Sequence, residues 1–386
     1  MPEIDAHLSD EHRAVRDLAR EFTAGEIAPH AERWNAEHHV PLDVLRKLGE
    51  LGLLGITVPE ELGGAGLDQT AVVLVVQEIA RADVGTSTAV AVQNGLGSSP
   101  IRQHGTEAQK EKFLPDVATG RRFAAYALTE PDAGSDAGSL RTVATAGDGE
   151  FLLSGSKTWI SNGGFAEVFI VFARTGGAGP RGISAFIVEK GGEGFTIGRE
   201  IPKMGLHTSS TVELAFDGHR VAADRMLGAE GAGMGIALQT LDAGRITIAS
   251  QACGIARAAL DLASSYARER VAFGGSIARF QGVQFPMAEI AAKVDAARLL
   301  TLHAAALCDA GKPHGTAGAK AKLFASRTAV EAADMAVQTL GGYGYSAEFP
   351  AERLYRDAKI TELYEGTSQI QRLVIARDLL GDAARG

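Results

Sequence analysis

The stretch Val143-Ala144-Thr145-Ala146-Gly147-Asp148-Gly149-Glu150-Phe151-Leu152-Leu153 decides the fold class, because it reads as a β-hairpin in a chain whose two ends read as helical. Asp148-Gly149 is a strong signal for a two-residue hairpin turn, and the residues on both sides favour strands. Further short runs rich in Val, Ile and Phe recur through residues 121–230, at 123–128, 167–173, 182–188 and 211–216. Without helical patterns between them, these runs predict a small antiparallel β-barrel or sandwich.

The part of the chain before the hairpin, residues 1–120, is predicted to be helical. A helix is expected between Ser9 and Pro29, since serine is a good N-cap and proline stops a helix. A second helix begins at Pro41. Apolar residues at helical spacing over residues 72–79 predict a third.

The part after the hairpin domain carries long helices. Three apolar patterns of some 25 or more residues cover 236–270, 286–310 and 316–340, and a final helix runs from 367 to 381. Long helices joined by short turns pack antiparallel, as in a four-helix bundle. The predicted fold is therefore mainly α with a β domain: an N-terminal helical domain (1–120), a middle antiparallel β-barrel (121–230) and a C-terminal four-helix bundle (231–386).

Composition narrows the function classes. Hydrophobic residues make up 45% and charged residues 22% of the 386 residues, as in a folded globular protein. The 47 acidic and 38 basic residues give a net charge of −9, so we expect no nucleic-acid partner. Two cysteines argue against a disulfide framework. No apolar run approaches the roughly 20 residues that span a bilayer, and Met1–Asp10 lacks the pattern of a signal peptide. We therefore expect a cytoplasmic protein that does not bind or span a membrane.

The common catalytic motifs are missing from the sequence. It has no G-x-x-x-x-G-K-[ST] loop, no G-x-G-x-x-G after a strand and no H-E-x-x-H. These absences argue against a phosphate-cradling loop, a Rossmann nucleotide site and a zinc site, and no metal is predicted.

Four short segments remain that are rich in glycine, hydroxyl and aromatic residues. Residues 127–136 run from the end of a predicted strand into a loop that could bind a flat polar heterocycle. Residues 159–162 begin with a tryptophan. Residues 338–345 end a bundle helix with paired glycines, and residues 364–369 place Glu365 just before the last helix. Taken singly, these segments are also typical of a β-turn, a core tryptophan, a helix C-cap and a helix-dipole partner. Their fixed order around one β domain and one bundle is far more specific.

With these four segments the chain resembles the acyl-CoA dehydrogenase family over nearly its whole length. The stretches 127–139, and 338–348 with 353–357, match both family signatures. The resemblance implies an N-terminal helical domain, a middle β-barrel and a C-terminal four-helix bundle. It also implies one FAD per subunit and a homotetramer built as a dimer of dimers.

The resemblance also assigns roles to residues. The implied flavin contacts are Tyr126, Leu128, Thr129, Gly134, Ser135, Trp159, Ile160, Ser161, Gln338, Leu340, Gly341, Gly342, Thr367, Ser368 and Gln369. Arg270 and Gln281 resemble residues that bind FAD across the dimer interface. The implied acyl-CoA contacts are Ser135, Asp242, Gly244, Arg245 and Gly366. His207 stands where arginine is common in the family, which leaves a charge role for its loop in doubt.

The implied reaction converts a saturated acyl-CoA to a trans-2-enoyl-CoA. By resemblance Glu365 takes the α-proton and the flavin takes the β-hydride, while the Glu365 N–H and a ribityl hydroxyl bind the thioester oxygen. Some branches of the family place the base one residue before the arginine that matches Arg245; that residue here is Gly244, which cannot titrate. An electron-transferring flavoprotein is the implied acceptor. Branched-chain or carrier-protein-bound thioesters, or an oxygen-using oxidase, stay open as alternatives.

Gln251 leads to a prediction of chain length. It lies seven residues beyond Gly244, two helical turns along the same face, and so about 10 Å further into the acyl pocket. A polar amide there disfavours a long alkyl chain. The surrounding helix also resembles the short-chain, butyryl-CoA branch. We expect preference for about four to six carbons; the alternative is that Gln251 faces another helix and bonds within the bundle.

Overall fold

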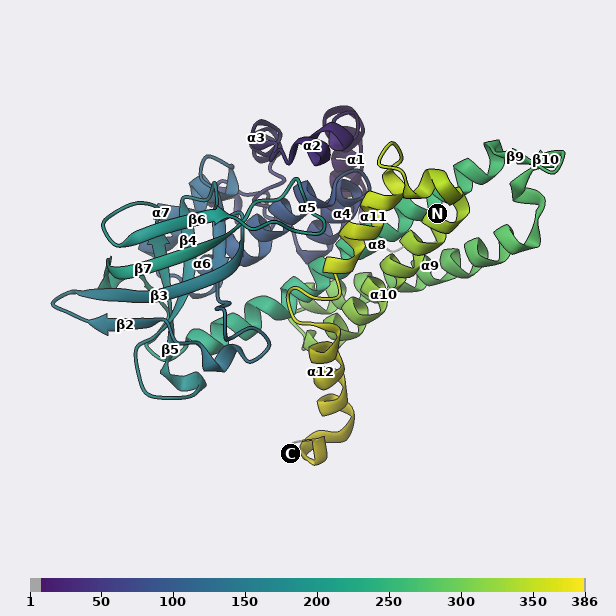
Figure 1. The fold of residues 1–386 in the computed structure, drawn as a ribbon. Helices are drawn as coiled ribbons and strands as arrows, with labels where there is room; N and C mark the ends of the chain where they lie inside the picture. Colours follow the sequence, from purple (N-terminus) through teal and green to yellow (C-terminus); the bar gives the residue numbers. More distant parts are fainter. Residues whose placement is uncertain (1–7, 385–386) are drawn as a thin grey trace.

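The computed structural model describes residues 8–384 (Figure 1). Met1–His7, part of the segment in which no signal peptide is predicted, lies outside the described residues. The N-terminal helices are α1 (Asp10–Phe22), α2 (Ala31–Glu37), α3 (Leu42–Glu50), α4 (Gln69–Ala80), α5 (Val84–Ala91), α6 (Ser98–His104) and α7 (Glu107–Ala118).

The predicted start of the first helix is confirmed by its cap, and the second helix begins at Leu42, directly after Pro41. The Ser9 hydroxyl accepts a hydrogen bond from the His12 N–H at 3.1 Å and begins α1. A π-helical turn, Thr23–Ile27, then extends this helix almost to Pro29, the predicted stop. The third predicted helix is confirmed as α4. Residues 70–80 of α4 are all buried, because α4 packs against α1, α5 and the bundle helices α8 and α9.

The β domain is one mixed sheet, so the prediction of an antiparallel barrel is wrong in part. Its strands are β1 (Ala124–Ala127), β2 (Val143–Ala146), β3 (Glu150–Ser161), β4 (Val168–Arg174), β5 (Ile183–Glu189), β6 (Phe195–Glu200), β7 (Thr211–Ala222) and β8 (Met226–Leu227). The order β6-β7-β3-β2-β4-β5-β8 ends at β6 and β8, and among the described strands these two do not pair to close a barrel. β1 pairs in parallel with β4, because the long connection that holds the β2–β3 hairpin returns the chain in the same direction.

The Asp148-Gly149 hairpin is confirmed. The Gly147 N–H donates to the Glu150 carbonyl at 2.8 Å, and β2 and β3 pair antiparallel on both sides of the turn. Gly149 has a φ of +73°, a value at which a side chain would strain the backbone.

The C-terminal helices are α8 (Gly233–Glu269), α9 (Gln281–Asp309), α10 (Gly315–Leu340), α11 (Pro350–Ile360) and α12 (Ser368–Leu380). The long predicted helices are confirmed, although α9 begins five residues before Pro286. Buried alanines line the contact between α8 and α10, and such small side chains let two helices approach closely. A short hairpin, β9 (Val271–Ala272) with β10 (Gly275–Ser276), joins α8 to α9.

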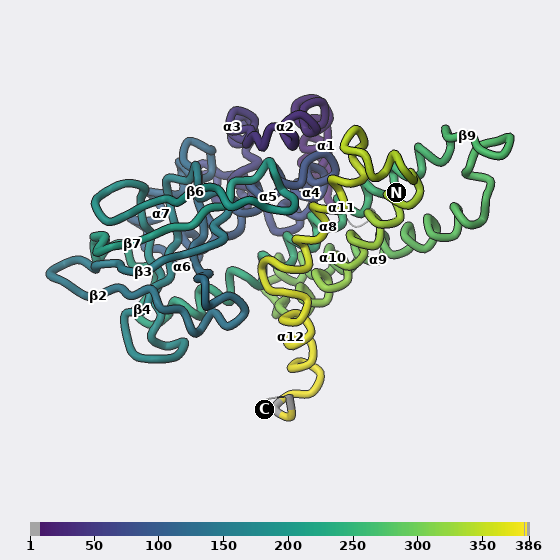
Figure 2. Tube along the Cα trace, in the orientation of Figure 1, coloured from purple at the N-terminus to yellow at the C-terminus, as the bar shows by residue number. Residues whose placement is uncertain are grey.

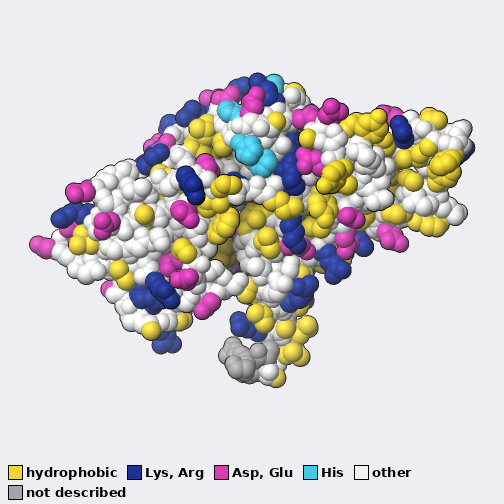
Figure 3. All heavy atoms as spheres, viewed as in Figure 1, with side chains coloured by type: hydrophobic (Ala, Val, Ile, Leu, Met, Phe, Trp, Pro, Cys, Tyr) yellow, Lys and Arg dark blue, Asp and Glu magenta, His cyan; other side chains and the backbone are white. Residues whose placement is uncertain are grey.

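The outline of the molecule has two projections. The β9–β10 hairpin lies at the far end of α8 and α9 from the β domain, and α12 leaves the bundle (Figures 1 and 2). Exposed hydrophobic side chains gather on both, including Phe273 (89% exposed) and Leu379 (71%) (Figure 3). Within residues 8–384, no helix combines the length and the apolar character that crossing a membrane requires.

Candidate active site

Glu365 lies in the tight turn between α11 and α12 with a positive φ of +49°. Its side chain points at α8. A Cβ atom added to Gly244 would stand 2.0 Å from Glu365 Oε2, so a side chain at position 244 would force the carboxylate out of this position. The structure thus brings together two positions that the sequence relates only through the resemblance.

The Glu365 carboxylate is desolvated. The residue as a whole is half-buried, but Oε2 is fully buried and has no hydrogen-bond partner. Burial raises the pKa of Glu365 to about 7, against the opposing charges of Lys322 and Arg245. A carboxylate in this state is a stronger base than a solvated one.

Lys322, on α10, is a site residue that the sequence analysis missed. Its side chain is 1% exposed, and its ammonium donates to the backbone carbonyls of Tyr364 (2.5 Å) and Gly366. Burial lowers the pKa of Lys322, while the charge of Glu365 raises it. The sequence does contain a pattern that could have pointed to it. Lys322 lies at helical spacing from the small residues Gly318 and Ala325, which are buried on the same face of α10.

Gln251 is fully buried, and its amide bonds bridge three parts of the chain. Nε2 donates to the Val84 carbonyl at 3.1 Å and to the hydroxyls of Ser87 (2.6 Å) and Thr88 (2.9 Å), all on α5. Oε1 accepts from the Tyr364 hydroxyl. Gln251 therefore contacts another helix, as in the alternative reading, but that helix belongs to the N-terminal region rather than to the bundle.

The segment after β1 is held by a buried ion pair. The Glu130 carboxylate accepts from Lys157 Nζ (2.7 Å) and from the backbone N–H groups of Arg141 (2.6 Å) and Thr142 (2.9 Å). Lys157 is fully buried, which lowers its pKa to about 8 even though the Glu130 charge raises it. The Thr158 N–H donates to the Thr129 carbonyl at 2.9 Å, and this bond ties the loop to β3.

This scaffold presents Trp159 to solvent. Trp159 is 58% exposed with a φ of +61°, so it is not a core tryptophan. Ser135 and Gly134 are also exposed in the loop, while Tyr126, Leu128 and Ile160 are buried beneath them. A positive φ at a bulky residue marks a position whose geometry serves more than packing.

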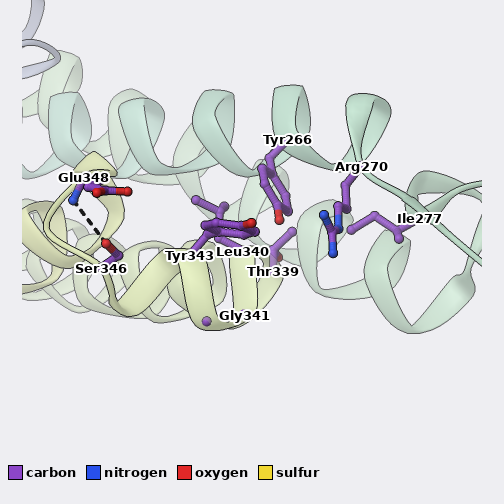
Figure 4. Close-up of a pocket in the computed structure, with 10 residues that line it drawn as sticks. Tyr266, Arg270, Ile277, Thr339, Leu340, Gly341, Tyr343, Ser346 and Glu348 are labelled. Atoms are coloured by element: carbon purple, nitrogen blue, oxygen red, sulfur yellow. Dashed lines mark hydrogen bonds between the residues drawn. The ribbon is translucent and has the colours of Figure 1, made fainter.

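Four of the remaining cofactor candidates line a cavity at the other end of the bundle. A cavity of about 590 Å³ is lined by the ends of α8 and α10, including Arg270, Leu340, Gly341 and Gly342. Figure 4 shows Arg270 and Tyr343 facing this space, and the guanidinium carbon stands 5.8 Å from the Tyr343 ring centroid. Gln281 does not line this cavity but is exposed at the start of α9.

The acyl-CoA candidates on α8 flank Glu365. Arg245 Nη1 donates to Asp242 Oδ1 at 2.6 Å, and Arg245 is 5% exposed. On the other side of Glu365, Gly366 has a φ of +93°, and the Thr367 hydroxyl caps α12 through the Ile370 N–H at 3.4 Å. Ser368 is buried in the first turn of α12, whereas Gln369 is exposed.

Comparison with known proteins gives close relatives over the full chain. A Bacillus subtilis acyl-CoA dehydrogenase is 48% identical over 97% of this chain and 99% of its own length. The mitochondrial short-chain specific acyl-CoA dehydrogenase of Bos taurus is 46% identical over 97% of this chain and 91% of its own.

Solved structures are equally similar. Butyryl-CoA dehydrogenase from Megasphaera elsdenii has a TM-score of 0.96 with 43% identity, covering 97% of this chain and all of its own. A chain from a structure of the electron-transferring flavoprotein of Acidaminococcus fermentans also reaches 0.96, at 46% identity, covering 98% and 100%. An acyl-CoA dehydrogenase from Bacillus anthracis complexed with FAD reaches 0.92 at 35% identity, covering 98% of this chain and 68% of that one.

The residues of this chain fit FAD. The 590 Å³ cavity combines the Arg270 cation with the Ser346 hydroxyl and the glycine pair 341–342, a donor set that suits a pyrophosphate. The exposed Trp159 offers an aromatic face to a flavin ring. Among residues 8–384 no cluster of three metal-ligating side chains occurs.

Three family domains match in chain order. The N-terminal domain of acyl-CoA dehydrogenases matches residues 9–121, the middle domain 125–219 and the C-terminal domain 231–380. Members of this family are FAD flavoproteins and oxidoreductases. By its domains, its fold and its relatives, this chain belongs to the acyl-CoA dehydrogenase family.

Proposed function

We propose that this protein oxidises a saturated short-chain acyl-CoA to the trans-2-enoyl-CoA, with Glu365 as the base that removes the α-proton. The observation that carries the proposal is the unpartnered, buried Oε2 of Glu365, which stands against Gly244 on α8. A buried acceptor atom without a partner is costly, and a substrate C–H placed there supplies what the atom lacks.

The Glu365 turn supplies two groups that belong to one residue. The carboxylate accepts the α-proton, and the backbone N–H donates to the thioester oxygen, where enolate charge develops. That N–H makes no hydrogen bond to any residue in the described part of the chain. Bound FAD supplies the acceptor for the β-hydrogen, which leaves as hydride.

Burial makes this carboxylate strong enough for the task. Glutamate in water has a pKa of about 4.3 and is a weak base. Here the desolvated site raises the pKa to about 7, so at neutral pH a large fraction of the protein holds an ionised, more basic carboxylate. Arg245 and Lys322 keep that fraction from falling further.

Tyr364 and Gln251 support the short-chain assignment. Together they form a hydrogen-bonded wall next to Glu365 that reaches α5. A long alkyl chain would have to break these bonds and leave buried polar atoms unpaired, which costs about 1–3 kcal/mol for each group. The butyryl-CoA and short-chain relatives agree with this preference.

Electron transfer and assembly complete the proposal. An electron-transferring flavoprotein would be the partner that accepts the electrons, in keeping with the Acidaminococcus relative. The protein works as a homotetramer, a dimer of dimers, in the cytoplasm. The exposed apolar residues on the β9–β10 hairpin and on α12 support burial of these projections against other subunits.

A panel of acyl-CoAs from four to sixteen carbons tests the proposal. Each substrate is mixed anaerobically with the purified yellow protein, and bleaching of the flavin absorbance is followed. We expect about one FAD per chain and fastest bleaching with four to six carbons. Correctly folded protein that cannot bind FAD, or that no acyl-CoA bleaches, would contradict the proposed function.

A further inference from the structure

The proposed reaction uses Lys322 only through its charge and leaves its two hydrogen bonds without a role. A fully buried lysine is costly unless its ammonium is paired or fully hydrogen-bonded. In the described part of the chain, Lys322 forms no ion pair within 4 Å, and the carboxylates of Glu365 and Glu362 act on it through charge alone. Its hydrogen bonds go to the backbone carbonyls of Tyr364 and Gly366, on the two sides of Glu365.

These two bonds fix the orientation of a peptide group. In a trans peptide the C=O and the N–H point in opposite directions. Because the Tyr364 carbonyl points at Lys322, the N–H of Glu365 points away from it. This is the same N–H that has no partner among residues 8–384 and that the proposed reaction uses.

The turn needs such support because its backbone is strained. Glu365 has a φ of +49° and Gly366 a φ of +93°. A non-glycine residue in the left-handed region costs of order 1–2 kcal/mol and persists only where its surroundings hold it. Gln371 Nε2 adds a third bond, to the Gly366 carbonyl at 2.8 Å.

We propose that Lys322 is a positioning residue, whose ammonium holds the 364–366 turn so that the Glu365 N–H faces the thioester oxygen and the Glu365 carboxylate stays charged. The inference rests on the proposed function. Lys322 touches neither substrate nor cofactor in this scheme and acts only through the turn and its own charge.

The charges around Glu365 show what removal of Lys322 changes. Lys322 faces the carboxylate from α10, Arg245 from α8 and Tyr126 from β1, while Tyr364 lies next to it in the turn. Lys322 and Arg245 both lower the pKa of Glu365, and burial raises it. Without the Lys322 charge, the pKa of Glu365 therefore rises further, and ionisation moves to higher pH.

The test uses Lys322→Met, Lys322→Arg and Lys322→Gln in the full-length holoprotein. Methionine has a similar length without charge or donors, arginine keeps both, and glutamine keeps donors without charge. Arg327→Met is the matched control, since Arg327 is an exposed cation on the same helix, paired with Glu331. The readouts are FAD content, the thermal midpoint, the pH profile of flavin reduction by butyryl-CoA, and enolisation of bound acetoacetyl-CoA.

We expect Lys322→Met to keep FAD but to reduce flavin about 10- to 100-fold more slowly, in line with a weakened oxyanion donor. Its pH midpoint rises by about one pH unit, and acetoacetyl-CoA enolises less. Lys322→Arg restores the midpoint, and Arg327→Met behaves like the unaltered protein. If the methionine variant does not fold, Lys322→Gln decides: its midpoint must rise.

Wild-type rates, midpoint and enolisation in Lys322→Met, or an unshifted midpoint in Lys322→Gln, would overturn the inference. Glu365→Gln, measured in parallel, separates this from failure of the proposed function. If Glu365→Gln reduces flavin normally, the proposed function is wrong. If Glu365→Gln is inactive while Lys322→Met is unaffected, only the role of Lys322 is wrong.

Discussion

The turn that carries Glu365 and the hairpin that follows Arg270 are both proposed to serve one cofactor chemistry, yet they are built in opposite ways. In the turn, whose backbone has positive φ, the buried Lys322 of α10 donates to the Tyr364 carbonyl, and Gly244 of α8 leaves room for the Glu365 carboxylate. Around the hairpin, Arg270 is exposed, as are Val271 (65%) and Phe273 (89%).

This difference in burial separates the part of the proposed site that one subunit forms by itself from the part that is open at its surface. The proposed base, its neighbouring charges and the lysine proposed to support it all come from a single chain. The Arg270 end presents an exposed cation and exposed apolar side chains. We infer that proton abstraction is built within the subunit, whereas cofactor retention depends on assembly.

The substitution Gly244→Ala is expected to have the largest effect on the turn that carries Glu365. The new Cβ would stand 2.0 Å from Glu365 Oε2, so the carboxylate must move. We expect flavin reduction by butyryl-CoA to fall at least about 100-fold, with FAD content and oligomeric state unchanged, as measured by stopped-flow absorbance.

Gly235→Ala is its matched control. Gly235 lies on the same helix, and an added Cβ there meets nothing within 4 Å. The control should react at the unaltered rate. A Gly244→Ala protein as fast as this control would show that the carboxylate is not where the reaction needs it.

Arg270→Ala tests the other half of the contrast. Loss of a hydrogen bond to a charged phosphate costs about 1.5–3 kcal/mol, so the dissociation constant of FAD should rise roughly 10- to 100-fold. Protein saturated with FAD should still be reduced at a near-normal rate. Arg268→Ala is the control, because Arg268 is an exposed neighbour that bonds Ser264.

Equilibrium dialysis gives the FAD affinity, and stopped-flow absorbance gives the rate. If Arg270→Ala retains FAD but slows reduction, the division between the two regions is wrong.

The pH dependence of flavin reduction tests whether the Glu365 carboxylate is desolvated in the turn. Only the ionised carboxylate is a base, and burial raises the pKa of Glu365 to about 7. At low butyryl-CoA concentration, the second-order rate constant of flavin reduction should rise tenfold per pH unit below about 7 and level off above it. A profile that is flat from pH 5 to 8 would mean that the carboxylate is not desolvated.

The smallest expected effect concerns the wall beside the turn. Gln251→Gly removes the bonds to α5 and to Tyr364, so the best chain length should move by a few carbons and the rate with eight carbons should rise a few-fold. Unpaired polar groups should also lower stability by about 1–3 kcal/mol. Substrate rates and urea unfolding measure the two effects, and an unchanged chain-length preference would remove Gln251 from the pocket.

Local signals in the sequence predicted much of the fold. The cap at Ser9, the Asp148-Gly149 turn and the three long helices depend on neighbouring residues, and each is present. The parallel pairing of β1 with β4 was not predictable in this way, because it joins residues about 44 positions apart.

The residues of the candidate site also differ in whether local sequence or tertiary packing reveals them. Glu365 and Trp159 stand out through their motifs, and the positive φ of each agrees with a special position. Lys322 did not stand out, because its role depends on backbone carbonyls more than 40 residues away. Gln251 was placed on the correct helix, but its partners on α5 come from tertiary packing.

The role of Glu365 as base is tested most directly by single-turnover flavin reduction in Glu365→Gln. The amide keeps the size of the side chain and removes the proton acceptor. With FAD bound and butyryl-CoA saturating, we expect the reduction rate to fall by several orders of magnitude while FAD content and the thermal midpoint are retained. Reduction at a near wild-type rate in this variant would show that another group takes the α-proton.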